Sequence, residues 1–208
     1  MLFRSDAIPA SIQDLLAKDR TPVATERARV AVFYSISNCQ PGLQGVSFGN
    51  FLIKQVVEEL KAEFPQLKQF STLSPIPGLR RWLGQRLANG SDADVALLPE
   101  LERDGWWNDP QQSETLRANL MQLCATYLTR KPSIRIDPVA RFHLGNGARL
   151  ERINWLGNTA PRGIQESFGI MVNYLYDHDS IEANHEAFVH DGTIARSADV
   201  DALLTKPD

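Results

Sequence analysis

The chain has 208 residues, of which 43% are hydrophobic and 23% charged, and this composition excludes a disordered or fibrous protein. Its net charge of −3 argues against a nucleic-acid surface, and its two cysteines are too few for a disulfide framework. No apolar run is long enough for a membrane helix and Arg4 and Asp6 leave no secretory signal, so we expect one globular domain over 1–208 in the cytoplasm.

Strand and helix patterns alternate in the first third of the chain. Ser11 is a helix-capping residue and predicts a short helix after it. The nearly continuous apolar run in 29–37 predicts a strand that is covered on both faces. Apolar residues then recur every four positions from 48 to 64, which predicts a helix, and 68–73 forms a second strand. This order is a βαβ unit with a parallel pair of strands.

The rest of the chain is predicted to be mostly helical. We expect helices at 78–87 and 92–101, a longer one that Ser113 caps, and one that begins at Asp137-Pro138 and closes at Gly145 or Gly147. We expect strands at 150–155 and 168–176, and a tail from Asp177 that is helical or irregular. The fold class is therefore α/β (α+β).

One candidate binding segment is the loop between the first apolar strand and the helix that follows. Free backbone N–H groups and the positive end of the helix dipole favour a phosphate there. The loop lacks the lysine of a P-loop and the spacing of a dinucleotide fingerprint, so a plain tight turn is the alternative. Its residues are Gln44, Gly45, Val46, Ser47, Phe48, Gly49 and Asn50.

A second candidate segment, Ser74–Gly78, follows the second strand. Ligands of open α/β sheets favour the carboxyl ends of strands. Pro75 and Pro77 stiffen the segment, which can hold the Ser74 hydroxyl in place with little loss of entropy. The alternative is a rigid turn into the next helix.

Among the four histidines, His143 is the readiest proton donor or acceptor, although a hydrogen-bonded core histidine is the alternative. His185 and His190 stand one residue too far apart for the two zinc ligands of a metalloprotease helix. We therefore predict no metal site.

Several motifs in a fixed order resemble the malonyl-CoA decarboxylase family. They are Phe33–Ser37, Gly42–Val46, Ser74–Gly78, Phe142–Ala148, Arg152–Trp155 and Asn173–Tyr176. The resemblance runs from about Ser11 to Asp177 and implies the C-terminal part of that family's catalytic domain, with a mixed sheet and flanking helices like those of N-acetyltransferases (GNAT). The implied reaction converts malonyl-CoA to acetyl-CoA and CO2 within fatty acid metabolism. It uses no metal and no cofactor, since coenzyme A is part of the substrate.

The resemblance also implies roles for individual residues. Residues 44–50 match the segment around the CoA pyrophosphate. Ser74 and His143 match the catalytic serine and histidine, and Ser35 and Tyr176 match residues that hydrogen-bond around the malonyl group. Loss of CO2 leaves an enolate, which needs hydrogen-bond donors at oxygen and a proton at carbon. Which of the two catalytic residues protonates the carbon stays open.

The chain departs from the family in length. Proteins of the family carry a further N-terminal half that includes the first strands of the catalytic domain. We therefore expect an incomplete sheet in which one edge of the 29–37 strand is bare unless the tail, a homo-oligomer or a partner chain covers it. Two alternatives remain beside the decarboxylase, a GNAT-type acyltransferase and a non-catalytic CoA-binding fragment.

Overall fold

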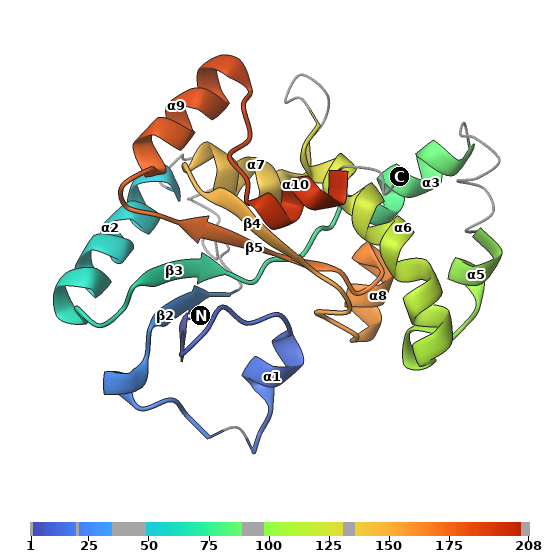
Figure 1. Cartoon of the computed structure of the whole chain (residues 1–208), viewed down its shortest axis with the longest axis horizontal. Coiled ribbons are helices and arrows are strands. Elements are labelled where there is room, and N and C mark those ends of the chain that lie inside the picture. Colours follow the sequence, from blue (N-terminus) through green and yellow to red (C-terminus); the bar gives the residue numbers. More distant parts are fainter. Residues whose placement is uncertain (1, 20, 35–48, 89–97, 131–135, 205–208) are drawn as a thin grey trace, which may run out of the picture.

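A computed structural model describes residues 2–19, 21–34, 49–88, 98–130 and 136–204. At its centre lies a five-stranded mixed sheet in the order β1-β2-β3-β5-β4 (Figure 1). The strands are β1 (Leu2–Ser5), β2 (Val30–Phe33), β3 (Gln69–Thr72), β4 (Arg149–Asn154) and β5 (Met171–Tyr176). Strands β2 and β3 are parallel, and the other pairs are antiparallel. The α/β class and the parallel pair of the βαβ unit are therefore confirmed.

Helices flank the sheet on both sides. In Figure 1, α1 lies below the strands, whereas α7 and α10 lie above them. The α-helices are α1 (Ile12–Leu16), α2 (Gly49–Glu63), α3 (Leu79–Ala88), α5 (Leu98–Glu102), α6 (Pro110–Leu128), α7 (Pro138–Gly145), α8 (Pro161–Ser167), α9 (Ile181–Asp191) and α10 (Ala198–Leu204). Two 3-10 turns, η1 (Thr25–Arg27) and η3 (Trp106–Asn108), complete the described elements.

Strand β2 is buried on both faces, as its apolar run predicts. Val30 and Val32 pack with Ile12 and Leu15 of α1 in a small cluster on one face. Ala31 and Phe33 belong to the main core on the other face. Successive side chains of a strand point to opposite faces, so two separate layers of apolar contacts require a continuous apolar run.

The expectation of a bare edge on β2 is wrong. β1 pairs with β2 along its whole length, from Leu2 opposite Phe33 to Ser5 opposite Val30. Four residues that alternate between exposed and half-buried positions carry little apolar signal of their own. Pairing with β2 makes them a strand, and this contact cannot be read from the local sequence.

The structure also differs from the sequence prediction at the start of α6 and in the segment before β5. Asp109, not Ser113, caps α6, because its side chain accepts from the amides of Gln111 and Gln112 while Pro110 occupies the first turn. Helix α8 is not among the elements that the sequence predicts. Strand β5 begins at Met171, since Phe168 ends α8 in the left-handed conformation with φ 56°.

Candidate active site

Ser74 lies just beyond the end of β3 and is held there by the backbone. Its amide donates to the Val172 carbonyl at 2.8 Å, and its carbonyl accepts from the Val172 amide at 2.9 Å. Thr72, the last residue of β3, stands two positions earlier, so the two hydroxyls point to the same face of the extended segment. Their oxygens are 2.9 Å apart.

His143 lies on α7, which lies above the strands in Figure 1, and its side chain contacts this face of the sheet. Asp137 caps the helix by accepting from the amides of Val139 and Ala140, as the Asp137-Pro138 pair predicts. The imidazole stacks on the Tyr174 ring with a centroid distance of 4.7 Å. This contact orients the imidazole against β5.

Both nitrogens of the imidazole have hydrogen-bond partners. Nε2 lies 3.3 Å from the Ser74 Oγ, and Nδ1 lies 2.7 Å from the Tyr176 hydroxyl. Burial lowers the pKa of His143 to about 3, because removal from water disfavours the charged imidazolium. The histidine is therefore neutral at physiological pH, a hydrogen-bonding group and not a cation.

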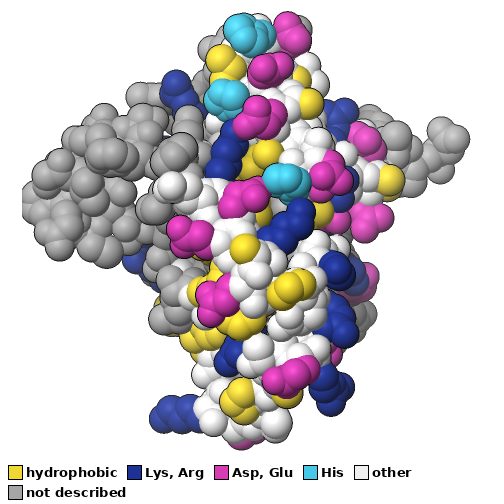
Figure 2. Space-filling view, turned by 90° about the vertical axis from the view of Figure 1, so that its left-hand side faces the viewer, with side chains coloured by type: hydrophobic (Ala, Val, Ile, Leu, Met, Phe, Trp, Pro, Cys, Tyr) yellow, Lys and Arg dark blue, Asp and Glu magenta, His cyan; other side chains and the backbone are white. Residues whose placement is uncertain are grey.

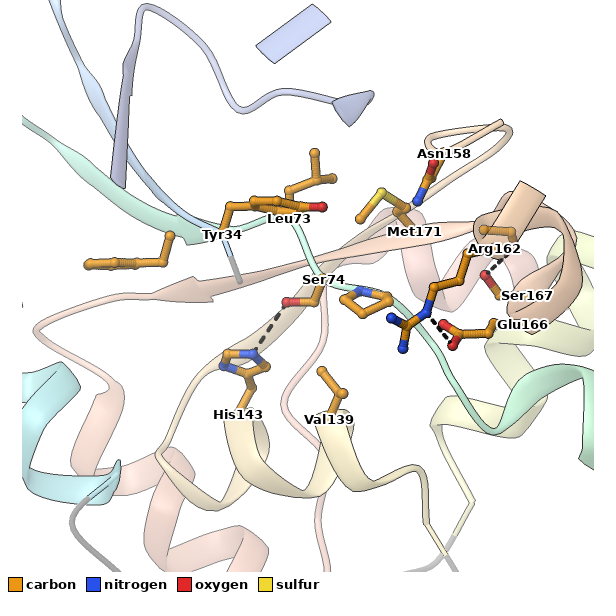
Figure 3. A pocket seen from close by; sticks show the side chains of 13 residues that line it. Tyr34, Leu73, Ser74, Val139, His143, Asn158, Arg162, Glu166, Ser167 and Met171 are labelled. Atoms are coloured by element: carbon orange, nitrogen blue, oxygen red, sulfur yellow. Dashed lines mark hydrogen bonds and ion pairs between the residues drawn. The ribbon is translucent and has the colours of Figure 1, made fainter. Parts of the chain in front are cut away.

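A cavity of about 440 Å³ opens beside this pair (Figure 3). Its volume is within the range of small-molecule sites. Both Ser74 and His143 line the cavity, between apolar side chains such as Leu73 and Met171. Arg162 is the single lysine or arginine among its described lining residues, and it pairs with Glu166 at 2.8 Å. The cavity therefore offers polar hydrogens near Ser74 but little net charge.

The family profile described as malonyl-CoA decarboxylase C-terminal domain matches residues 3–208. The chain belongs to the malonyl-CoA decarboxylase family. It is 39% identical to the mitochondrial malonyl-CoA decarboxylase of Anser anser anser, over 96% of this chain and 45% of that protein. It is 36% identical to the mouse (Mus musculus) protein of the same name, over 92% of this chain and 44% of the relative. The chain thus spans about half the length of the curated relatives it matches.

Solved structures of malonyl-CoA decarboxylases share the fold. The structure from Rhodopseudomonas palustris has a TM-score of 0.92 and 47% identity, covering 97% of this chain and 48% of that one. The structure from Agrobacterium vitis has a TM-score of 0.93 and 46% identity, covering 99% and 52% of the two chains. These similarities extend through almost all of this chain, beyond the Ser11–Asp177 segment on which the sequence resemblance rests.

The structure brings together three of the expected site residues, Ser74, His143 and Tyr176, from the segment after β3, from α7 and from β5. Gly49 and Asn50 begin α2, and their part in binding CoA stays a prediction. Five expected loop residues and Ser35 lie outside the described residues, the five being Gln44, Gly45, Val46, Ser47 and Phe48.

Sequence reasoning missed Thr72 and Tyr174, which contact Ser74 and His143 directly. The sequence pattern that could have indicated them is the spacing of two residues along an extended segment, which places side chains on the same face. Thr72 stands two residues before Ser74, and Tyr174 stands two residues before Tyr176. This spacing indicates Thr72 and Tyr174 only after Ser74 and Tyr176 have been identified as site residues.

The described surface carries mixed charges. Figure 2 shows acidic, basic and histidine side chains intermingled on one face. Among the described residues, Lys54 pairs with Glu182 at 3.2 Å, and Nδ1 of His178 lies 2.6 Å from a carboxylate oxygen of Glu58. In the described part of the chain, no group of three His, Cys, Asp or Glu side chains could hold a metal ion. None of the described helices combines the length and the apolar character needed to cross a membrane.

Proposed function

We propose that this chain carries the decarboxylase site for malonyl-CoA, with Ser74 and His143 as the catalytic pair. The observation that carries the proposal is their hydrogen-bond contact at 3.3 Å in the wall of a cavity. The match to the family profile over 3–208 supports the substrate class. The reaction breaks the bond between the carboxylate and the methylene carbon, and the electron pair moves into the thioester to form an enolate.

A neutral His143 suits this reaction. The enolate oxygen carries the developing negative charge and is stabilised by fixed hydrogen-bond donors, which typically contribute ~10²–10³ in rate. The Ser74 hydroxyl is such a donor, and the neutral imidazole can support it through its contact with Ser74, since a pKa of about 3 leaves the imidazole uncharged. We propose that the pair stabilises the enolate and delivers the proton to its carbon, the thioester being the electron sink, so that no cofactor is required.

The small net charge of the cavity favours loss of CO2. The substrate carboxylate is an anion that becomes neutral CO2, so a strong ion pair with it would stabilise the ground state over the transition state. Arg162, the cation in the described lining, is paired with Glu166 at 2.8 Å. Most of the described lining consists of apolar and uncharged groups. Such surroundings stabilise a localised carboxylate poorly, which lowers the barrier to decarboxylation.

Other roles stay proposals. We propose that Gln44–Asn50 hold the CoA pyrophosphate at the N-terminus of α2, and that Ser35 and Tyr176 take part in the hydrogen bonding around the malonyl group, Tyr176 through its contact with His143. A GNAT-like fold, a role in fatty acid metabolism and a cytoplasmic location remain predictions, and the two curated relatives above are named as mitochondrial proteins. A homo-oligomer or partner chain also remains a prediction, although β1 already covers the edge of β2 that motivated it.

The test is acetyl-CoA formation from malonyl-CoA by the purified, folded chain, followed by mass spectrometry. We expect Ser74→Ala and His143→Ala to lower kcat by ~10²–10⁴ while CoA binding persists. Matched controls are Ser113→Ala in α6 and His190→Ala in α9, which lie outside the cavity lining and should retain turnover. If neither active-site variant lowers turnover, the assignment of the pair is wrong.

The two alternatives predict different outcomes in assays with CoA thioesters. An acyltransferase would release free CoA from acetyl-CoA in the presence of an amine. Glu166 is the carboxylate in the described cavity lining that such a reaction could use, and it pairs with Arg162 at 2.8 Å. A folded chain that binds CoA without turning over malonyl-CoA would be the non-catalytic fragment.

A further inference from the structure

The catalytic pair belongs to a longer chain of hydrogen-bonding groups. From one end, the Tyr176 hydroxyl lies 2.7 Å from Nδ1 of His143, and Nε2 lies 3.3 Å from the Ser74 Oγ. The Ser74 Oγ lies 2.9 Å from the Oγ1 of Thr72, which accepts from the Tyr174 amide at 3.1 Å. The four side chains of this hydrogen-bonded series are all buried, namely those of Tyr176, His143, Ser74 and Thr72. Each proton along it therefore needs a partner within the protein or the cavity.

The Tyr176 end determines where the proton of the imidazole sits. Among the described residues, the Tyr176 hydroxyl has one hydrogen-bond partner, Nδ1 of His143. A buried O–H without an acceptor costs about 1–3 kcal/mol, so the phenol donates to Nδ1. A neutral imidazole has one N–H, which then lies on Nε2 and donates to the Ser74 oxygen. His143 is thus a donor toward Ser74 and not a base that takes its proton.

The Thr72 end determines where the proton of Ser74 goes. The Tyr174 amide belongs to β5 and fixes the position of the Thr72 oxygen from the backbone side. With one lone pair of Ser74 occupied by His143, the Ser74 hydroxyl donates to Thr72, and the Thr72 proton then has no acceptor among the described hydrogen bonds. A threonine hydroxyl can also donate, because its proton rotates about the C–O bond. The 2.9 Å contact therefore has two directions.

We propose that Thr72 is a positioning residue. Its oxygen accepts the hydrogen bond of the Ser74 hydroxyl in the free protein, and its rotation frees that hydroxyl to donate to the substrate. This inference rests on the proposed decarboxylase function. When a thioester oxygen enters the cavity, the Thr72 hydroxyl turns and donates to the Ser74 Oγ. Ser74 then accepts from both His143 and Thr72, and its own O–H points to the enolate oxygen. Both hydroxyl groups only rotate about their C–O bonds, so no covalent bond forms or breaks.

The kinetic test compares Thr72→Val, which removes the hydroxyl, with Thr72→Ser, which keeps it. We expect Thr72→Val to lower kcat at least ~10-fold with KM within about threefold, and Thr72→Ser to retain most of the wild-type kcat. Thr126→Val is the matched control, since Thr126 lies in α6 and donates to the Gln122 carbonyl away from the cavity. Turnover of Thr72→Val within about twofold of wild type overturns the proposal.

The structural test needs no substrate and reads the tautomer of His143 by 15N NMR, with His143→Gln identifying its signals. We expect Nε2–H in the wild-type chain. In Thr72→Val, the Ser74 proton is left with Nε2 as its protein acceptor, so the population should shift toward Nδ1–H. An Nδ1–H wild type overturns the proposal even where Thr72→Val does not fold, and so does an unchanged tautomer in folded Thr72→Val. Absence of acetyl-CoA formation by wild type would instead refute the proposed function.

Discussion

Asp137 accepts a hydrogen bond from the Gly78 amide at 2.9 Å, across a sequence separation of 59 residues. The other oxygen of the same carboxylate accepts from the amides of Val139 and Ala140, at the first turn of α7. One side chain thus joins the turn that follows Ser74 to the helix that carries His143. This buried link, which lies outside the cavity lining, holds the elements that bring Ser74 and His143 into contact.

We expect Asp137→Ala to lower the free energy of unfolding by about 2–4 kcal/mol. The helix cap contributes about 0.5–2 kcal/mol, and the Gly78 amide would be left without its acceptor in a buried place, at a further cost of about 1–3 kcal/mol. Asp109→Ala is the matched control, because Asp109 caps the more exposed start of α6 in the same way. Urea unfolding measures both changes, and equal losses in the two variants would contradict the special role of Asp137.

Gly78 cannot carry a side chain in this arrangement. A Cβ there would collide with the Tyr127 hydroxyl and lie 3.0 Å from Oδ2 of Asp137. We expect Gly78→Ala to lower the free energy of unfolding by ~1–3 kcal/mol and to reduce turnover. Gly84→Ala is the control, since nothing lies within 4 Å of its Cβ and alanine favours the helix by up to ~1 kcal/mol. A stabilised Gly78→Ala protein would contradict the close packing at this turn.

The stability of the protein should depend on pH through His143. Its pKa is about 6.5 in the unfolded chain and about 3 in the folded one. Between these values the unfolded chain binds a proton that the folded chain does not. The free energy of unfolding therefore falls as the pH is lowered through this range, by at most ~1.4 kcal/mol per unit.

The comparison that isolates this effect is wild type against His143→Gln, by chemical unfolding from pH 7 to pH 4. Burial raises the pKa of Asp137, which acts in the opposite direction. Because Asp137 is present in both proteins, the difference between the two curves reports on His143. We expect the variant to lose less stability on acidification, and parallel curves would show that the histidine is not buried in its neutral form.

The two tyrosines of β5 should respond differently to loss of their hydroxyls. Tyr176→Phe removes the partner of Nδ1 of His143 at 2.7 Å, and we expect kcat to fall at least ~10-fold with CoA binding retained. The Tyr174 hydroxyl is buried with no hydrogen-bond partner among the described residues. Tyr174→Phe keeps the ring on His143, so thermal unfolding should show stability equal to or above that of wild type. A destabilised Tyr174→Phe would show that this hydroxyl has a partner.

Patterns that repeat within one element were sufficient to predict several parts of the fold. The apolar run of β2 predicts its burial on two faces, and the recurrence of apolar residues every four positions predicts α2. Asp137-Pro138 predicts the start of α7, because a cap depends on residues two or three positions away. The motifs around Ser74 and His143 indicated the family by their types and order along the chain.

The tertiary structure alone decided how these parts meet. Ser74 and His143 are 69 residues apart, and their contact requires the pairing of β3 with β5 and the packing of α7 above them. The cover that β1 gives to β2 and the link from Asp137 to Gly78 are also contacts between distant segments. A sequence pattern reports on neighbours within one turn or strand, whereas the neutral state of His143 and the direction of the Ser74 proton depend on burial and partners that only folding brings together.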